Sequence, residues 1–139
     1  MKRAFVLTFL FASIALANAN PLQQNSAGND AVPATTGASL TLSPTTLSFG
    51  VQLLNKLSAT KTINLMNVGS TALSIAKLFV TGNFRIQAST CGTTLAAGAP
   101  CTVTIVFQPA GTLNRYGNLW IYDNGGGSPQ KVAWTGVGI

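Results

Sequence analysis

Apolar residues fall on every second position in short runs from about residue 39 onward, which is the pattern of β-strands with one buried face. The clearest run is residues 102–107, where Val103, Ile105 and Phe107 alternate and Pro109 ends the strand. Turn residues separate it from similar runs at 40–42, 47–49, 61–67, 84–87 and 132–134. Seven or eight strands at this spacing, without a convincing helix, predict an all-β sandwich.

One of these runs changes phase partway along. An apolar face begins with Leu73 and Ile75. Strict alternation would continue it at position 77, but the face continues with Leu78 and Val80 instead. An extra residue in a strand produces such a change, so we expect a β-bulge between the two halves. Phe79 then points away from the core.

The run at residues 116–122 predicts a second set of outward side chains. The residues that fit its inward face are Gly117, Leu119 and Ile121. Alternation places their neighbours on the opposite face of the sheet. The candidate binding face therefore consists of Phe79, Tyr116, Asn118, Trp120 and Tyr122. The last strand directs Trp134 inward, so the two tryptophans are expected to face opposite ways.

Three interpretations of this aromatic row remain open. Aromatic side chains on a flat sheet can anchor a protein partner or stack against sugar rings. Alternatively, the rings only stabilise the sheet, with each cross-strand pair contributing about 0.2–1 kcal/mol. A third possibility is that the N-terminal segment folds back over them.

The first 19 residues have the three parts of a secretory signal peptide. Lys2 and Arg3 give a positive start, residues 4–16 are almost entirely apolar, and Ala17-Asn18-Ala19 forms a cleavage site. The apolar run is shorter than the about 20 residues of a membrane span, so cleavage is expected rather than anchoring. We therefore expect export to the periplasm or the extracellular space, with no transmembrane segment in the mature chain.

The segment between the expected cleavage site and the first strand differs in composition from the apolar residues before it and the alternating runs after it. Residues 20–38 are small, polar and aperiodic, which predicts a flexible linker. One domain at residues 39–139 then follows.

The chain lacks the side chains that most catalytic and metal sites require. It contains no His and no Glu, and its only acids are Asp30 and Asp123. General acid–base catalysis usually needs a His or two carboxylates with separated pKa values. Zinc sites use Cys, His and carboxylate ligands, and calcium sites need several oxygen ligands, usually carboxylates. We therefore expect no enzymatic activity, no metal site and no cofactor.

The cationic side chains are scattered rather than clustered. In the expected mature chain they are Lys56, Lys61, Lys77, Arg85, Arg115 and Lys131. A nucleic-acid-binding surface would gather such residues on one element, so we expect no nucleic-acid partner.

The two cysteines, Cys91 and Cys101, have nine residues between them. An even number in a small exported chain is typical of a disulfide, although two free buried thiols are the alternative. Closing so short a loop would stabilise the fold by about 2.5–3 kcal/mol. The spacing does not fit a CxxC redox pair.

A series of segments resembles the bacterial choice-of-anchor D domains. The segments are LSPTTLSFG at 42–50, NVGSTAL at 67–73, CGTTLAAGAPC at 91–101 running into Phe107-Gln108-Pro109, G-x-L-x-I-x-D-N at 117–124, Ser128-Pro129-Gln130 and Gly136-x-Gly138. They occur in order over roughly residues 40–139, and the segment at 91–101 is the most diagnostic.

The resemblance implies an immunoglobulin-like antiparallel β-sandwich, similar to hydin and abnormal-spindle (ASH) domains and to major sperm protein. It also implies that Cys91 pairs with Cys101. Members of the family are regarded as interaction or structural modules, and they bring no catalytic residues. We therefore predict an exported, non-catalytic structural or protein-interaction module of the bacterial envelope or extracellular space. A carbohydrate-binding module that uses the aromatic row is the alternative. The sequence indicates neither the identity of the partner nor the oligomeric state.

Overall fold

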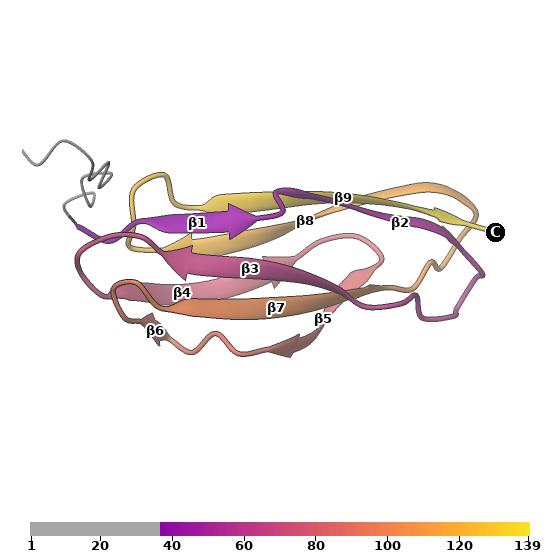
Figure 1. Cartoon of the computed structure of the whole chain (residues 1–139). Coiled ribbons are helices and arrows are strands. Elements are labelled where there is room, and N and C mark those ends of the chain that lie inside the picture. Colours follow the sequence, from indigo (N-terminus) through magenta and orange to yellow (C-terminus); the bar gives the residue numbers. More distant parts are fainter. Residues whose placement is uncertain (1–36) are drawn as a thin grey trace, which may run out of the picture. The chain divides into compact units, whose positions relative to one another are not determined.

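The structure is a computed structural model, and it describes residues 37–139 as a β-sandwich (Figure 1). Over this range no helix is long and apolar enough to cross a membrane. The expected signal peptide at residues 1–19 lies outside the described residues, as does the expected linker except for its last two positions.

Nine strands form two sheets. The strands are β1 (Leu40–Ser43), β2 (Thr46–Gln52), β3 (Lys61–Asn67), β4 (Leu73–Val80), β5 (Phe84–Ser89), β6 (Thr94–Leu95), β7 (Pro100–Phe107), β8 (Leu113–Asp123) and β9 (Gln130–Gly138). One sheet has the order β1-β3-β7-β5, and the other has the order β2-β9-β8-β4-β6. The predicted sandwich is confirmed. The ninth strand is the two-residue β6, which is too short to leave a periodic signal in the sequence.

One strand pair differs from the predicted antiparallel arrangement. β1 and β2 follow each other closely along the chain but belong to opposite sheets. β2 therefore lies at the edge of the five-stranded sheet, where it pairs parallel with β9 while the other pairs are antiparallel. Figure 1 shows β2 beside β9. This pairing brings the first part of the domain next to the last.

The core consists of the alternating inward side chains of the two sheets. The residues buried most completely include Ile63, Leu65, Val103, Ile105, Phe107, Leu119, Ile121, Val132 and Trp134. Burying one such side chain stabilises the folded state by about 1.5–3 kcal/mol. Phe84 joins the two sheets, because its ring lies 4.6 Å from that of Phe107 and 5.4 Å from that of Trp134.

Asn67, at the end of β3, is a fully buried polar residue that fixes the following turn. Its side-chain amide donates to the carbonyl oxygens of Thr71 at 2.8 Å and Leu95 at 3.0 Å. Its Oδ1 accepts the backbone N–H of Gly69 at 3.0 Å and that of Ser39 at 3.4 Å. Buried backbone N–H and C=O groups need hydrogen-bond partners, and this one side chain supplies them to several segments.

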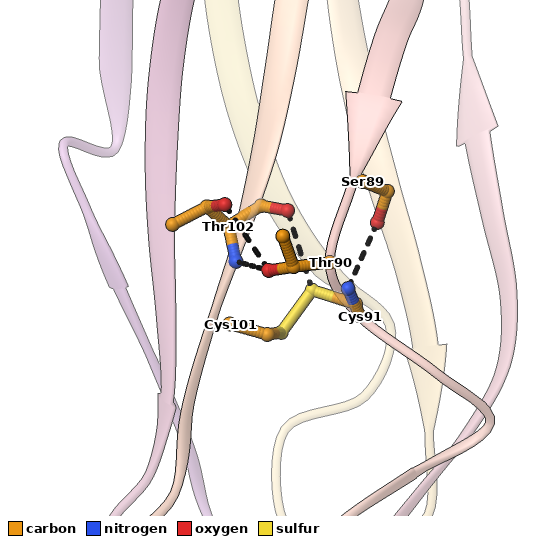
Figure 2. Close-up of a disulfide and its surroundings, with 5 residues drawn as sticks. All are labelled: Ser89, Thr90, Cys91, Cys101 and Thr102. Atoms are coloured by element: carbon orange, nitrogen blue, oxygen red, sulfur yellow. Dashed lines mark hydrogen bonds between the residues drawn. A yellow bond between two sulfur atoms is a disulfide. The ribbon is translucent and has the colours of Figure 1, made fainter.

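Cys91 and Cys101 form a disulfide with a Cα–Cα distance of 5.0 Å, so the predicted pairing is confirmed and free thiols are excluded (Figure 2). Thr90 lies beside the bond, and its Oγ1 accepts the backbone N–H of Thr102 at 2.8 Å. The backbone N–H of Thr90 also donates to the carbonyl oxygen of Thr102 at 2.9 Å. The disulfide therefore clips the chain after β5 to the start of β7.

Candidate binding surface

The five outward residues predicted from the sequence lie together on the outer face of the five-stranded sheet. Phe79 belongs to β4, and Tyr116, Asn118, Trp120 and Tyr122 belong to β8. Phe79 and Trp120 are register partners across the β4–β8 pair. We call these five residues the aromatic face. The exposed fraction is 67% for Tyr116, 44% for Phe79 and 41% for Tyr122, whereas Asn118 and Trp120 are half-buried.

The outward position of Phe79 depends on a bulge in β4. The register with β8 shifts between Ile75, which pairs with Asp123, and Lys77, which pairs with Tyr122. The inserted residue reverses the alternation, so Leu78 turns toward the core and Phe79 turns away from it. Without the bulge, Phe79 would point into the core.

Two lysines lie over rings of the aromatic face. The Nζ atom of Lys77 is 4.8 Å from the ring centre of Phe79, and that of Lys131 is 5.6 Å from the ring centre of Trp120. Both distances lie within the range of a cation–π interaction. Lys131, in β9, is the register partner of Trp120, so the two lysines flank β8 on either side. Sequence analysis counted them only as scattered surface charge.

A shallow hollow adjoins the aromatic face on the side of β2. Its volume is about 230 Å³, and its lining includes Ser48, Gly50, Asn114, Tyr116, Thr135 and Val137. It forms because the small side chains of β2 and β9 lie beside the large ring of Tyr116. Sequence analysis missed it, since only the parallel β2–β9 pairing brings Ser48 next to Thr135.

The only carboxylate side chain among residues 37–139 is that of Asp123, at the end of β8. Its Oδ1 accepts the backbone N–H of Gly125 at 2.6 Å, and its Oδ2 is buried without a partner among the described residues. Burial raises the pKa of this carboxyl above its usual range, against the lowering effect of the Gly125 N–H. The part of the chain that the structure describes contains no group of three His, Cys, Asp or Glu side chains that could hold a metal ion. The expectation that the protein is not an enzyme stays a prediction.

Comparison of the sequence with protein-family models and with curated proteins gives no match. Solved structures with a similar fold include a protein of unknown function from Porphyromonas gingivalis W83, with a TM-score of 0.62, 17% identity and coverage of 75% of this chain and 48% of that one. The ASH / PapD-like domain of human CEP192 (PapD-like domain 7) matches with a TM-score of 0.53 and 16% identity over 72% of this chain and 84% of that one. The secreted serine protease VesC from Vibrio cholerae matches with a TM-score of 0.51 and 20% identity over 75% of this chain and 23% of that one.

These similarities define the class of the fold. The chain spans about half of the Porphyromonas protein and about a quarter of VesC, so the likeness concerns only part of each. Residues 37–139 form an immunoglobulin-like β-sandwich like that of the ASH / PapD-like domain. The role of the aromatic face in binding stays a prediction, because sandwiches of this fold serve unrelated functions.

Proposed function

We propose that this chain is an exported, non-catalytic binding module of the choice-of-anchor D type, and that its aromatic face is the binding surface. The observation that carries the proposal is the concentration of four aromatic side chains on one open sheet face, three of them more than 40% exposed. Exposed aromatic side chains in such a cluster often mark an interaction site.

The alternative role, aromatic packing that only stabilises the sheet, fits the geometry poorly. The ring–ring contacts found in residues 37–139 join the core residues Phe49, Phe84, Phe107 and Trp134. None of them joins two members of the aromatic face. Tyr116 has Thr135 as its register partner rather than another ring. Its 67% exposure leaves the ring available to a partner.

Three observations support export. The Cys91–Cys101 disulfide is of the kind that persists in oxidising compartments such as the periplasm and the extracellular space. The sequence of residues 1–19 has the features of a signal peptide. Part of the secreted serine protease VesC from Vibrio cholerae also has a similar fold.

Affinity capture from a cell-envelope extract tests the proposal. The bait is the protein as exported, compared with a Tyr116→Ala/Trp120→Ala/Tyr122→Ala variant. The control is Thr62→Ala/Asn64→Ala/Met66→Ala, which removes three exposed side chains from β3 in the opposite sheet. Circular dichroism and an intact disulfide establish that both variants are folded. We expect a partner that the native bait and the control retain and the aromatic variant loses. Equal recovery by all three baits would contradict a role for the aromatic face.

The sequence alone favours a protein partner, and the structure adds an observation that favours a glycan. The hollow beside Tyr116 places the polar side chains of Ser48, Asn114 and Thr135 next to an exposed ring. Sugars present apolar C–H faces together with hydroxyl groups, and binding sites for small polar ligands combine these two kinds of contact. A carbohydrate-binding module is therefore the second candidate.

A further inference from the structure

We infer that the aromatic face binds an acidic polysaccharide, in which sugar rings carry carboxylate groups, lying along β8. This inference rests on the proposed function, because it requires the aromatic face to be a binding surface. It commits to the charge and the class of the ligand, which the proposed function leaves open. Three features of the surface carry it: two exposed lysines, a line of aromatic rings, and polar groups beside that line.

The first feature is positive charge at the aromatic face. Lys77 in β4 and Lys131 in β9 are both exposed. Their strands lie two strand spacings apart and the two residues are offset by two positions along β8, so their Cα atoms are about 12 Å apart. Among residues 37–139 neither has a carboxylate partner, because the only acidic side chain, Asp123, has one oxygen bound to Gly125 and the other buried. Six cationic side chains against this one acid give the described part of the chain a net charge of +5. An anionic ligand is therefore attracted to the surface and can neutralise both lysines.

The second feature is the line of rings along one strand. Three rings project from the same face of β8: those of Tyr116, Trp120 and Tyr122. Along the strand, the Cα atom of Trp120 lies about 13 Å from that of Tyr116, and the Cα atom of Tyr122 lies about 7 Å further on. A flat, extended chain of rings can contact more than one of these side chains at once. The two lysines lie beside the Trp120–Tyr122 part of the line, where Trp120 pairs with Lys131 and Tyr122 pairs with Lys77.

The third feature is the hollow at the other end of the line. Ser48, Asn114 and Thr135 are exposed and line it beside Tyr116. Hydroxyl and amide groups in this position can donate to and accept from the hydroxyls of a sugar. The surface thus offers rings for the apolar faces of a glycan, polar groups for its hydroxyls, and ammonium groups for its carboxylates.

An acidic peptide fits the same surface less well. A bound peptide brings backbone N–H and C=O groups that need hydrogen-bond partners. The backbone beneath the aromatic face is already paired within β4, β8 and β9, so it offers none. A peptide that adds as a strand would bind at a sheet edge instead. The face itself favours a ligand whose polar groups are hydroxyls and carboxylates.

Titration calorimetry of the exported protein with oligomers of polygalacturonate, polymannuronate and polyguluronate tests the inference. Methyl-esterified polygalacturonate is the matched ligand control, because it keeps the sugar rings and removes the charge. The two test variants are Lys77→Ala/Lys131→Ala and Tyr116→Ala/Trp120→Ala. The matched protein control is Lys56→Ala/Arg85→Ala, which removes the same charge from exposed positions in the β2–β3 connection and in β5.

We expect at least one acidic oligomer to bind, and its esterified or neutral counterpart to bind more weakly. Because exposed charges act modestly and are screened by salt, the double lysine variant should bind about five- to tenfold more weakly at low salt, with a smaller difference at high salt. The affinity of the double aromatic variant should be lower by about tenfold or more. The control variant should bind like the native protein.

Each other outcome overturns the inference in a distinguishable way. Equal binding of charged and esterified chains would exclude charge recognition while leaving the aromatic face as a binding surface. Equal weakening by the control variant would indicate nonspecific attraction to net charge. If no acidic glycan binds while envelope capture still depends on the aromatic face, the inference is wrong and the partner is a protein. If envelope capture is also independent of the aromatic face, the proposed function is wrong as well.

Discussion

Trp120 of β8 and Trp134 of β9 lie on neighbouring strands, and their side chains leave the five-stranded sheet on opposite faces. Trp134 is 2% exposed and packs against Phe84, with ring centres 5.4 Å apart. Trp120 belongs to the aromatic face and is half-buried, partly under the Lys131 side chain. The two indoles therefore report separately on the core and on the candidate binding surface.

The first prediction uses this difference. In variants that each keep one tryptophan, Trp134→Phe and Trp120→Phe, iodide should quench Trp120 several-fold more strongly than Trp134. The reason is that a collisional quencher reaches the outer face but not the packed core. Fluorescence with increasing iodide measures the effect, and circular dichroism checks that both variants are folded. Equal protection of the two indoles would mean that the register of β8 is wrong.

The second prediction concerns Gly117, which lies between the aromatic residues of β8 and faces inward. A Cβ atom there would collide with the backbone carbonyl of Thr81 and with the Trp134 indole. Because overpacking a close-packed core forces neighbours to shift, Gly117→Ala should lower the free energy of unfolding by about 1–3 kcal/mol. The matched control is Gly126→Ala, where a Cβ atom would meet nothing within 4 Å.

Urea denaturation measures both glycine variants. The control should stay within about 0.5 kcal/mol of the native protein, as surface substitutions usually do. Equal stability of Gly117→Ala and the native protein would show that Trp134 does not pack against this position.

The third prediction concerns the disulfide. Cys91→Ala/Cys101→Ala should lower the free energy of unfolding by about 2.7 kcal/mol, the chain-entropy value for a loop of about ten residues. The same loss should follow reduction of the native protein with dithiothreitol, and reduction should leave the variant unchanged. A stable variant whose midpoint matches that of the oxidised protein would show that the clip between β5 and β7 is dispensable.

The fourth prediction is a pH dependence set by Asp123. Burial raises the pKa of its carboxyl in the folded state, so the folded state holds the proton more tightly than the unfolded state does. The resulting stability is fully present below the unfolded pKa of about 3.8, and it is lost as the pH rises through the higher folded pKa.

Asp123→Asn isolates this effect, because all other titrating groups are shared with the native protein. The native protein should lose stability relative to the variant as the pH rises from about 3 to about 6, and the difference should then level off. Thermal unfolding at a series of pH values measures it. A difference that is constant with pH, or that changes in the opposite direction, would contradict the assignment.

The alternation of residue types predicted the parts of the structure that depend on local pattern. The inward side chains of β7, and the outward phase of Phe79 after the bulge, follow from positions that lie close together in the sequence. The pairing of Cys91 with Cys101 came from the resemblance, since two cysteines alone leave free thiols as an alternative. For β7 and Phe79, the residues that carry the information are close neighbours along the chain.

Features that depend on strand order were not predicted. Periodicity says which face a residue occupies but not which strand lies beside it. The parallel β2–β9 pairing therefore went unseen, together with the hollow between Ser48 and Tyr116. The position of Lys131 over Trp120 also depends on the register of two strands. The sequence of β8 alone thus predicts the aromatic residues of the proposed binding site, whereas the hollow and the position of Lys131 depend on the strand order.

Photo-crosslinking in the native host tests the central claim most directly. In the test variant, a benzophenone amino acid replaces Tyr116 on the aromatic face. In the control variant, it replaces Met66, which is 44% exposed and lies on β3 in the opposite sheet. Benzophenone inserts into C–H bonds, so it captures a protein or a glycan alike. We expect a crosslinked product from position 116 and none from position 66. Products from position 66 alone, or equally from both positions, would contradict the claim that the aromatic face is where this module binds its partner.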